Sequence, residues 1–285
     1  MKKRGIFLRK AKDGLIRIFS AMTILLAIGV MVWILYTVIC KGAAIMSFGF
    51  LTHASKPFGI AAGGVANAIL GSLLITLGAA IIAIPPAVCA GIYLAEFSTY
   101  PKLSGVLRFC ANVMMGIPSV LVGLFVYMLM VATMGHFSGL SASVALAIIM
   151  FPVIMRTTED MLLMIPYTLR ESALALGMTK TRTTLAVVCR SAKNGLLTGI
   201  LLALSRVSGE TAPLLFTALF SDSWPTGYFS EPTANLPVLI TEYATNSPFE
   251  SMQRAGWGAA LVVTILVLCS NLGVRIFFRE KKSGQ

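Results

Sequence analysis

Two charged side chains, Arg206 and Glu210, stand within a long apolar stretch of the sequence. Their spacing of four residues places them on one face of a continuous helix. Ionisable groups in apolar surroundings are costly, and they usually pair with each other or line a water-filled path. A guanidinium is a planar fork that matches the oxygens of an oxyanion. The two residues therefore form either a structural ion pair or a site on the path of an anion.

The carboxylate beside the arginine would restrict which oxyanion fits. At neutral pH inorganic phosphate still carries a hydroxyl proton, which it can donate to Glu210 in a hydrogen bond, whereas sulfate carries none and meets an unpaired carboxylate. Glu210 also screens Arg206, so that a bound anion is not trapped. Gly209 and Pro213 flank the pair, and proline removes a helical hydrogen bond. Such breaks at membrane depth are typical of segments that line a cavity, although glycine and proline are also tolerated in ordinary membrane helices.

The composition indicates an integral membrane protein. Of the 285 residues, 57% are hydrophobic and 12% are charged, which is about half the charged share of a soluble domain. Lipid suits such a chain because a helix satisfies its own backbone there. The net charge of +12 could suggest nucleic-acid binding, but the basic residues flank the apolar runs, as membrane topology requires.

Six apolar stretches approach the roughly 20 residues that a helix needs to cross a bilayer. We therefore predict an all-α membrane fold with six spans. The third span contains Pro118, the second is broken by Pro85-Pro86, and the fourth is short unless it continues past Arg156. The candidate spans are Ile18–Cys40, Asn67–Leu94, Leu103–Thr133, Leu140–Met155, Gly195–Phe220 and Ala255–Phe278.

Positive charge concentrates on one side of these spans. On the other side the basic residues are only Lys41, Lys56 and Arg254. Positive residues remain cytoplasmic, so we predict a multi-pass protein of a bacterial inner membrane with both termini in the cytoplasm. The expected parts are a cytoplasmic N-terminus at 1–17, a transmembrane domain at 18–278 with a cytoplasmic loop at 156–194 and an external loop at 221–254, and a cytoplasmic tail at 279–285.

Catalytic chemistry finds no support in the sequence. The five cysteines are scattered singly, which indicates neither a disulfide framework nor a metal site. His53 and His136 lie far apart in predicted loops. The H-E-x-x-H, G-x-S-x-G and G-x-x-x-x-G-K-[ST] motifs are absent. We expect no catalytic residue, metal site or bound cofactor, and any ATP and Mg²⁺ must be used by a partner chain.

The cytoplasmic loop contains a short predicted helix. Residues Glu171 to Leu176 are mostly good helix formers, and Gly177 supplies a stop because glycine readily adopts the left-handed conformation that ends helices. Small residues such as Ser172 and Ala173 allow another protein to approach closely. From composition alone, this segment is equally an ordinary interfacial helix.

The pattern Glu171-Ser-Ala-x3-Gly177 resembles the loop of ATP-binding-cassette importer permeases that docks into the ATPase subunit. Ser172 stands where that loop usually has alanine, and the downstream Ile-x-Leu-Pro is not kept. A longer ordered set of motifs runs along the chain: Gly63–Ser72, Gly91–Glu96, Ile117–Ser119, Arg156–Glu159, Arg170–Gly177, Gly209–Thr217 and Ala234–Pro237. Together they resemble the PstA family, permease subunits of the phosphate-specific importers.

The resemblance implies a type I importer permease fold and a non-catalytic role as half of the phosphate pathway. It implies a PstC-like second permease, two copies of a PstB-like ATPase, which couple through Glu171, Ser172, Ala173 and Gly177, and an external PstS-like phosphate-binding protein. The aromatic residues of the external loop either anchor it in the membrane or receive that binding protein. The alternatives are a permease for phosphonate, molybdate or sulfate, an intramembrane enzyme, and a passive channel.

Overall fold

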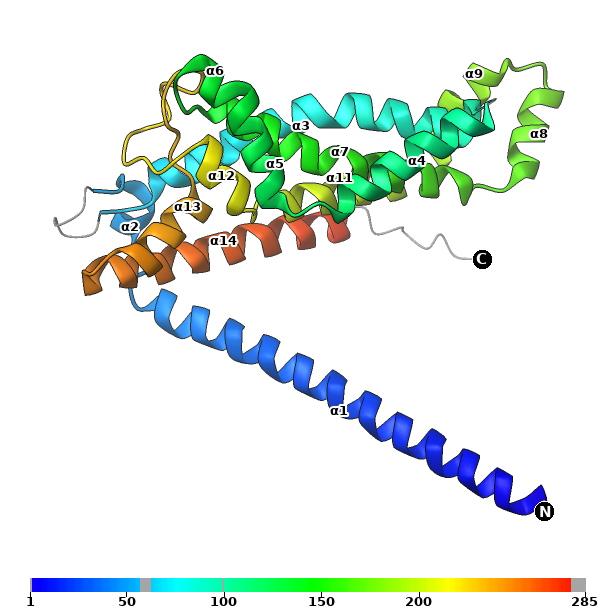
Figure 1. Cartoon of the computed structure of the whole chain (residues 1–285). Helices are drawn as coiled ribbons and strands as arrows, with labels where there is room; N and C mark the ends of the chain where they lie inside the picture. The colour runs from blue at the N-terminus through cyan, green and yellow to red at the C-terminus, as the bar shows by residue number, and fades with distance from the viewer. Residues whose placement is uncertain (1, 57–62, 99, 278–285) are drawn as a thin grey trace.

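The computed structural model describes residues 2–56, 63–98 and 100–277 and is helical, with no strand in that part of the chain. The predicted tail at 279–285 and the last residue of the sixth predicted span, Phe278, lie outside the described residues. Figure 1 shows a long helical bundle from which the first helix, α1 (Lys2–Ala43), diverges. The predicted all-α fold is confirmed.

The centre of the bundle is the packing of α3 (Ala66–Ile92) against α7 (Gly139–Leu163), the most extensive helix contact of the described residues. Ala79, Ala83 and Ala87 recur every fourth residue on α3 and are buried, which lets the two backbones approach closely. The prediction that Pro85-Pro86 break this span is wrong, because α3 continues through both prolines. Packing along its whole length holds the helix together where two hydrogen bonds are lost.

Four helices are long and apolar enough to cross a membrane, or six if each of two bent pairs counts as one span. One bent pair joins α4 (Pro101–Gly116) to the segment made of α5 (Ser119–Val126), η2 (Tyr127–Val131) and α6 (Ala132–Met134), at an angle of 100°. The third predicted span is therefore not one straight helix. Pro118 is the cause, because proline pushes the preceding residue out of helical geometry, and Ile117 is extended.

The helix α7 continues past Arg156 to Leu163, into the first part of the loop predicted at 156–194. Four short helical segments then carry the chain into α11 (Lys193–Val207), which makes a 71° bend with the segment before it. These elements are α8 (Tyr167–Ala175), α9 (Lys180–Thr183), η3 (Thr184–Val188) and α10 (Cys189–Ser191). In Figure 1, α8 and α9 form one end of the bundle, and the N-terminal end of α1 points toward the same side.

The opposite end of the bundle is closed by short helices and by the loop after α12 (Ala212–Thr217). These helices are α2 (Phe48–Thr52), α13 (Leu236–Thr241) and η4 (Glu242–Asn246), packed near the start of α14 (Glu250–Phe277). Tyr228 of this loop reaches between α3 and α7, where its hydroxyl lies 2.5 Å from that of Ser143. The aromatic residues of the loop are therefore not all anchors or partner contacts, since Tyr228 is a packing residue of the bundle.

The helix α1 is almost free of the bundle. Its apolar window is 0% buried, and it contacts α14 at its C-terminal end, where Gly42 lies against Leu261 and the carbonyl of Trp257. A Cβ at residue 42 would lie 2.6 Å from Leu261 Cβ, so only glycine permits this crossing.

Candidate substrate pathway and docking helix

Arg206 and Glu210 do not share a helical face, contrary to the sequence prediction. The helix α11 ends at Val207, and the chain turns through Ser208 and Gly209 before α12 begins. The amide of Glu210 donates to the carbonyl of Val207 in this turn, at 3.1 Å. The four-residue spacing assumed an uninterrupted helix, and the break predicted from Gly209 and Pro213 removes that assumption.

The break nevertheless brings both side chains to one cavity of about 250 Å³. Both residues line it, and in the described chain Arg206 is exposed and Glu210 is half-buried. Neither forms an ion pair within the part of the chain that the structure describes. They are the charged residues of a wall that is otherwise apolar apart from Ser119, and whose other members are Met114, Met115, Ile117, Pro118, Val122, Ile148, Ile149 and Val153.

Two helix breaks meet at this cavity. The bend at Ile117-Pro118 supplies one wall and the break after Val207 supplies another, while α7 lies between them. The segments beyond the two breaks, α5 and α12, pack closely, and a Cβ on Gly123 would lie 2.6 Å from Pro213 Cα. Irregular backbone at membrane depth is tolerated where it is buried in protein or lines a water-filled space. The arrangement can accordingly hold a small anion beside the guanidinium of Arg206, which has no ion-pair partner among the residues that the structure describes.

The predicted short helix is α8, and it presents its motif residues on two sides. Ala173 is buried against the bundle, whereas Glu171, Ser172 and Gly177 are exposed. Large apolar side chains are exposed beside them, among them Tyr167 at 69% and Leu176 at 83%. An exposed apolar surface rimmed by polar residues is typical of an interface.

Gly177 ends α8 in the conformation that the sequence predicts. Its φ is +81°, and the amides of Gly177 and Met178 donate to the carbonyls of Leu174 and Ala173. This double hydrogen bond is the Schellman arrangement, which needs a left-handed residue after the helix. No other atom would touch a Cβ at residue 177, so backbone conformation alone selects glycine here.

Gly177→Ala should therefore weaken the end of α8 by about 1 kcal/mol. If α8 is the docking helix, the affinity of the ATPase subunit for the chain should fall by about fivefold. The measurement is titration of the purified chain with its ATPase. Gly135→Ala is the matched control, because Gly135 also has a positive φ, +76°, but lies after α6 at the opposite end of the bundle. Equal affinities in the two variants would argue against docking at α8.

Arg170 fastens α8 to the bundle through one buried guanidinium. Its Nε and Nη2 donate to Glu96 Oε1 at 3.0 and 2.6 Å. Its Nη1 donates to the carbonyl of Ile165 at 2.6 Å, and Nη2 also donates to that of Leu162 at 2.8 Å. The side chains of Arg170 and Glu96 are 13% and 7% exposed. Glu96 belongs to η1 (Tyr93–Phe97), the single π-helical turn that ends α3.

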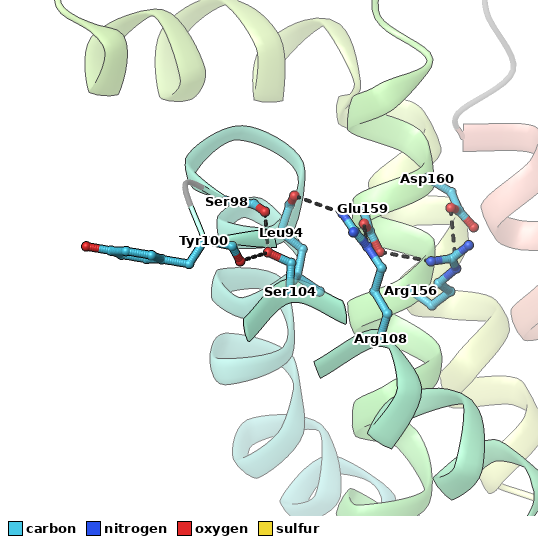
Figure 2. A network of polar contacts seen from close by, with 8 residues as sticks. All are labelled: Leu94, Ser98, Tyr100, Ser104, Arg108, Arg156, Glu159 and Asp160. Carbon is cyan, nitrogen blue, oxygen red and sulfur yellow. Dashed lines mark hydrogen bonds and ion pairs between the residues drawn. The ribbon is translucent and has the colours of Figure 1, made fainter. Parts of the chain in front are cut away.

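A second buried carboxylate, Glu159, joins α7 to α4 (Figure 2). Its side chain is 1% exposed and lies 2.6 Å from Arg108 Nε and 3.1 Å from Arg156 Nη1. Arg156 also reaches Asp160, at 3.5 Å. Arg108 Nη2 donates to the carbonyl of Leu94 in η1, at 3.4 Å. Arg156 and Glu159 thus pair within α7, and Arg108 joins that helix to α4.

Sequence reasoning missed both long-range ion pairs. The spacing of Arg156 and Glu159 is a local signal, but Arg108 lies 51 residues from Glu159, and Glu96 lies 74 residues from Arg170. Basic residues near predicted helix ends are ordinarily topology determinants, and nothing local marks them as partners of a buried carboxylate.

At the opposite end, Asn67 fastens the loop after α12 to α3. Its side-chain amide donates to the carbonyls of Asp222 and Ser223, and its oxygen accepts from the amide of Ser55. Burial raises the pKa of the Asp222 carboxyl. The pKa of Tyr243 is raised to about 12, mainly because the side chain is buried and secondly because the negative charge of Asp222 lies near it. Tyr243 therefore stays neutral at physiological pH and serves as a packing residue.

Known proteins place this architecture in a family. A family model described as binding-protein-dependent transport system inner membrane component matches residues 87–282. The phosphate transport system permease protein PstA of Yersinia pestis is 43% identical over 274 residues, which cover 96% of this chain and 92% of that protein. This chain belongs to the PstA family. The matched residues include Arg206, Glu210 and all of α8.

Other members of the PstA family have similar levels of sequence identity to this chain. The protein of Haemophilus influenzae is 42% identical, with 96% of each chain covered. PstA 1 of Mycobacterium tuberculosis strain H37Rv is 36% identical over 93% of this chain and 86% of its own. The resemblance to the PstA family found in the sequence is thus confirmed, and a multi-pass inner-membrane location follows for the chain.

Solved structures support the fold. A chain of the MetNI methionine ABC transporter in an inward-facing conformation superposes with a TM-score of 0.64, covering 75% of this chain and 94% of its own. The sequence identity is 18%, so the likeness concerns the fold. The predicted importer-permease architecture is confirmed.

Proposed function

We propose that this chain is the transmembrane permease subunit of an ATP-driven importer of inorganic phosphate and forms half of the translocation pathway with a second permease. The observation that carries the proposal is Arg206, which faces a cavity at two helix breaks without an ion-pair partner among the described residues. An unpaired guanidinium beside a small cavity is suited to a passing oxyanion. The names of the PstA relatives support phosphate as that oxyanion.

Glu210 is the residue that favours phosphate over fully deprotonated oxyanions. It lines the same cavity as Arg206, and its carboxylate can accept a hydrogen bond from the hydroxyl that hydrogen phosphate still carries. Sulfate and molybdate offer no such proton and meet like charge instead. This is the physical reason to prefer phosphate to sulfate and molybdate.

The exposed helix α8 is the proposed docking site for the ATPase, with Glu171, Ser172, Ala173 and Gly177 as its coupling residues. The α8 end of the bundle then faces the cytoplasm, together with both termini, as the distribution of positive charge requires. The remaining partners are a PstC-like permease, a PstB-like ATPase dimer and an external PstS-like phosphate-binding protein. The chain itself binds no cofactor in this proposal, and ATP and Mg²⁺ act in the ATPase.

The experiment is a reconstitution of this chain with its native partners in proteoliposomes. Labelled phosphate should accumulate inside only when ATP is present on the α8 side and the binding protein on the other. Excess unlabelled phosphate should abolish accumulation, whereas equal excesses of sulfate, molybdate and phosphonate should not. Accumulation without ATP would indicate a passive channel, and preferential competition by another oxyanion would transfer the assignment to that substrate.

A further inference from the structure

The π-helical turn η1 contacts two arginines from different helices, Arg170 of α8 and Arg108 of α4. On one side, Arg170 of α8 holds the carboxylate of Glu96. On the other, Arg108 of α4 donates to the carbonyl of Leu94 and pairs with Glu159 of α7 (Figure 2). The turn therefore connects α8 to α4 although the two helices are far apart in the sequence.

Each end of this connection has a distinct place in the structure. The α8 end carries the exposed motif, and the α4 end reaches the cavity of Arg206 through Met114 and Met115. Arg108 lies about 10 Å from Met115 along α4, at 1.5 Å per residue. A displacement of η1 that moves α4 would thus move one wall of the cavity.

The connection from α8 to η1 is stiff, whereas η1 itself is irregular. The guanidinium of Arg170 is largely buried and makes four hydrogen bonds, and two of them go to the carbonyls of Leu162, near the end of α7, and of Ile165, just after it. Charge-assisted bonds of this kind hold geometry closely. A single π-helical turn is rare and is frequent at functional sites.

We propose that η1 transmits displacement of α8 to α4, so that Arg170 and Glu96 are positioning residues that couple ATP hydrolysis to opening of the Arg206 cavity. The inference rests on the proposed function, because it requires α8 to be the docking helix. The competing route is the covalent chain alone, from α8 into α7 and α9. That route predicts no special role for the ion pair beyond stability.

The test uses the complete complex in proteoliposomes and measures phosphate imported and ATP hydrolysed in the same vesicles. The principal variant is Glu96→Gln with Arg170→Gln, which removes both charges and leaves neither uncompensated. The matched control is Glu250→Gln with Arg254→Gln, an exposed ion pair on α14 with side chains 78% and 69% exposed. Glu96→Gln alone keeps an acceptor oxygen and the shape of the site and removes only the negative charge, which leaves the guanidinium of Arg170 without its counter-charge.

In the double variant we expect normal assembly and ATP hydrolysis, with phosphate imported per ATP lower by about tenfold. Glu96→Gln should lower that ratio less, and the control should not change it. A ratio equal to the control in the assembled double variant, or in Glu96→Gln, would overturn the inference. So would a proportional loss of uptake and hydrolysis, which is the signature of a merely structural pair. If the wild-type complex imports no phosphate, the proposed function fails instead.

Discussion

Arg206→Gln should lower phosphate uptake by about 100-fold while the complex still assembles. Glutamine keeps much of the length of the side chain but loses the charge and the forked donors. Two charge-assisted hydrogen bonds to phosphate are worth about 3 kcal/mol in total, which corresponds to about 100-fold. The measurement is the initial rate of labelled phosphate uptake, normalised to the amount of assembled complex.

The structure predicts that this loss concerns transport rather than stability. Arg206 is exposed and neutralises no carboxylate among the described residues. Its removal therefore leaves no buried charge unpaired. Arg206→Lys should retain part of the uptake, since it keeps the charge without the fork. Arg254→Gln, at an exposed arginine of α14, is the control for a simple loss of positive charge. Normal uptake by assembled Arg206→Gln complexes would refute the pathway role.

Arg108→Met should have the largest effect on stability. It removes one of two arginines around Glu159, whose side chain is 1% exposed. Breaking a buried ion pair from one side costs about 3–5 kcal/mol. Arg108 itself is 38% exposed and Arg156 still holds the carboxylate, so we expect about 2 kcal/mol, below that range. The midpoint of thermal unfolding in detergent should fall by about 4–8 °C.

If Arg108→Met destabilises the protein by leaving Glu159 with one arginine fewer, then removing Glu159 as well should restore stability. Arg108→Met combined with Glu159→Met replaces the pair by apolar side chains and should recover most of the lost stability. Arg254→Met, from the exposed pair on α14, should shift the midpoint by no more than about 1 °C. If Arg108→Met unfolds at the wild-type temperature, Glu159 does not need its second arginine.

Patterns that depend only on neighbouring residues could be predicted from the sequence. The apolar stretches predicted an all-α membrane fold, and Gly177 predicted the end of α8, because a left-handed residue after a helix is a local requirement. The break around Gly209 and Pro213 was predicted for the same reason. Its consequence was not foreseen, since a break changes the direction of the next segment and thereby removes the shared face of Arg206 and Glu210.

Features that depend on tertiary packing could not be predicted. Pro85 and Pro86 predict an interruption, but contact with α7 keeps α3 helical through them. The ion pairs of Glu159 and Glu96 require the rotation of several helices about their axes, which apolar composition does not specify. The cavity could not be predicted either, because it forms where the tertiary structure places the bend at Pro118 beside the break after Val207.

Because these two breaks meet at the cavity, its walls are helical segments that end at hinges. A continuous helix can alter such a space only by shifting or unwinding as a whole. Here α4 and α11 can each swing about a joint at their ends while every intrahelical hydrogen bond persists. The aperture around Arg206 can thus widen or narrow through changes in the backbone dihedral angles at the two breaks, which suits a passage that must open and close in every cycle.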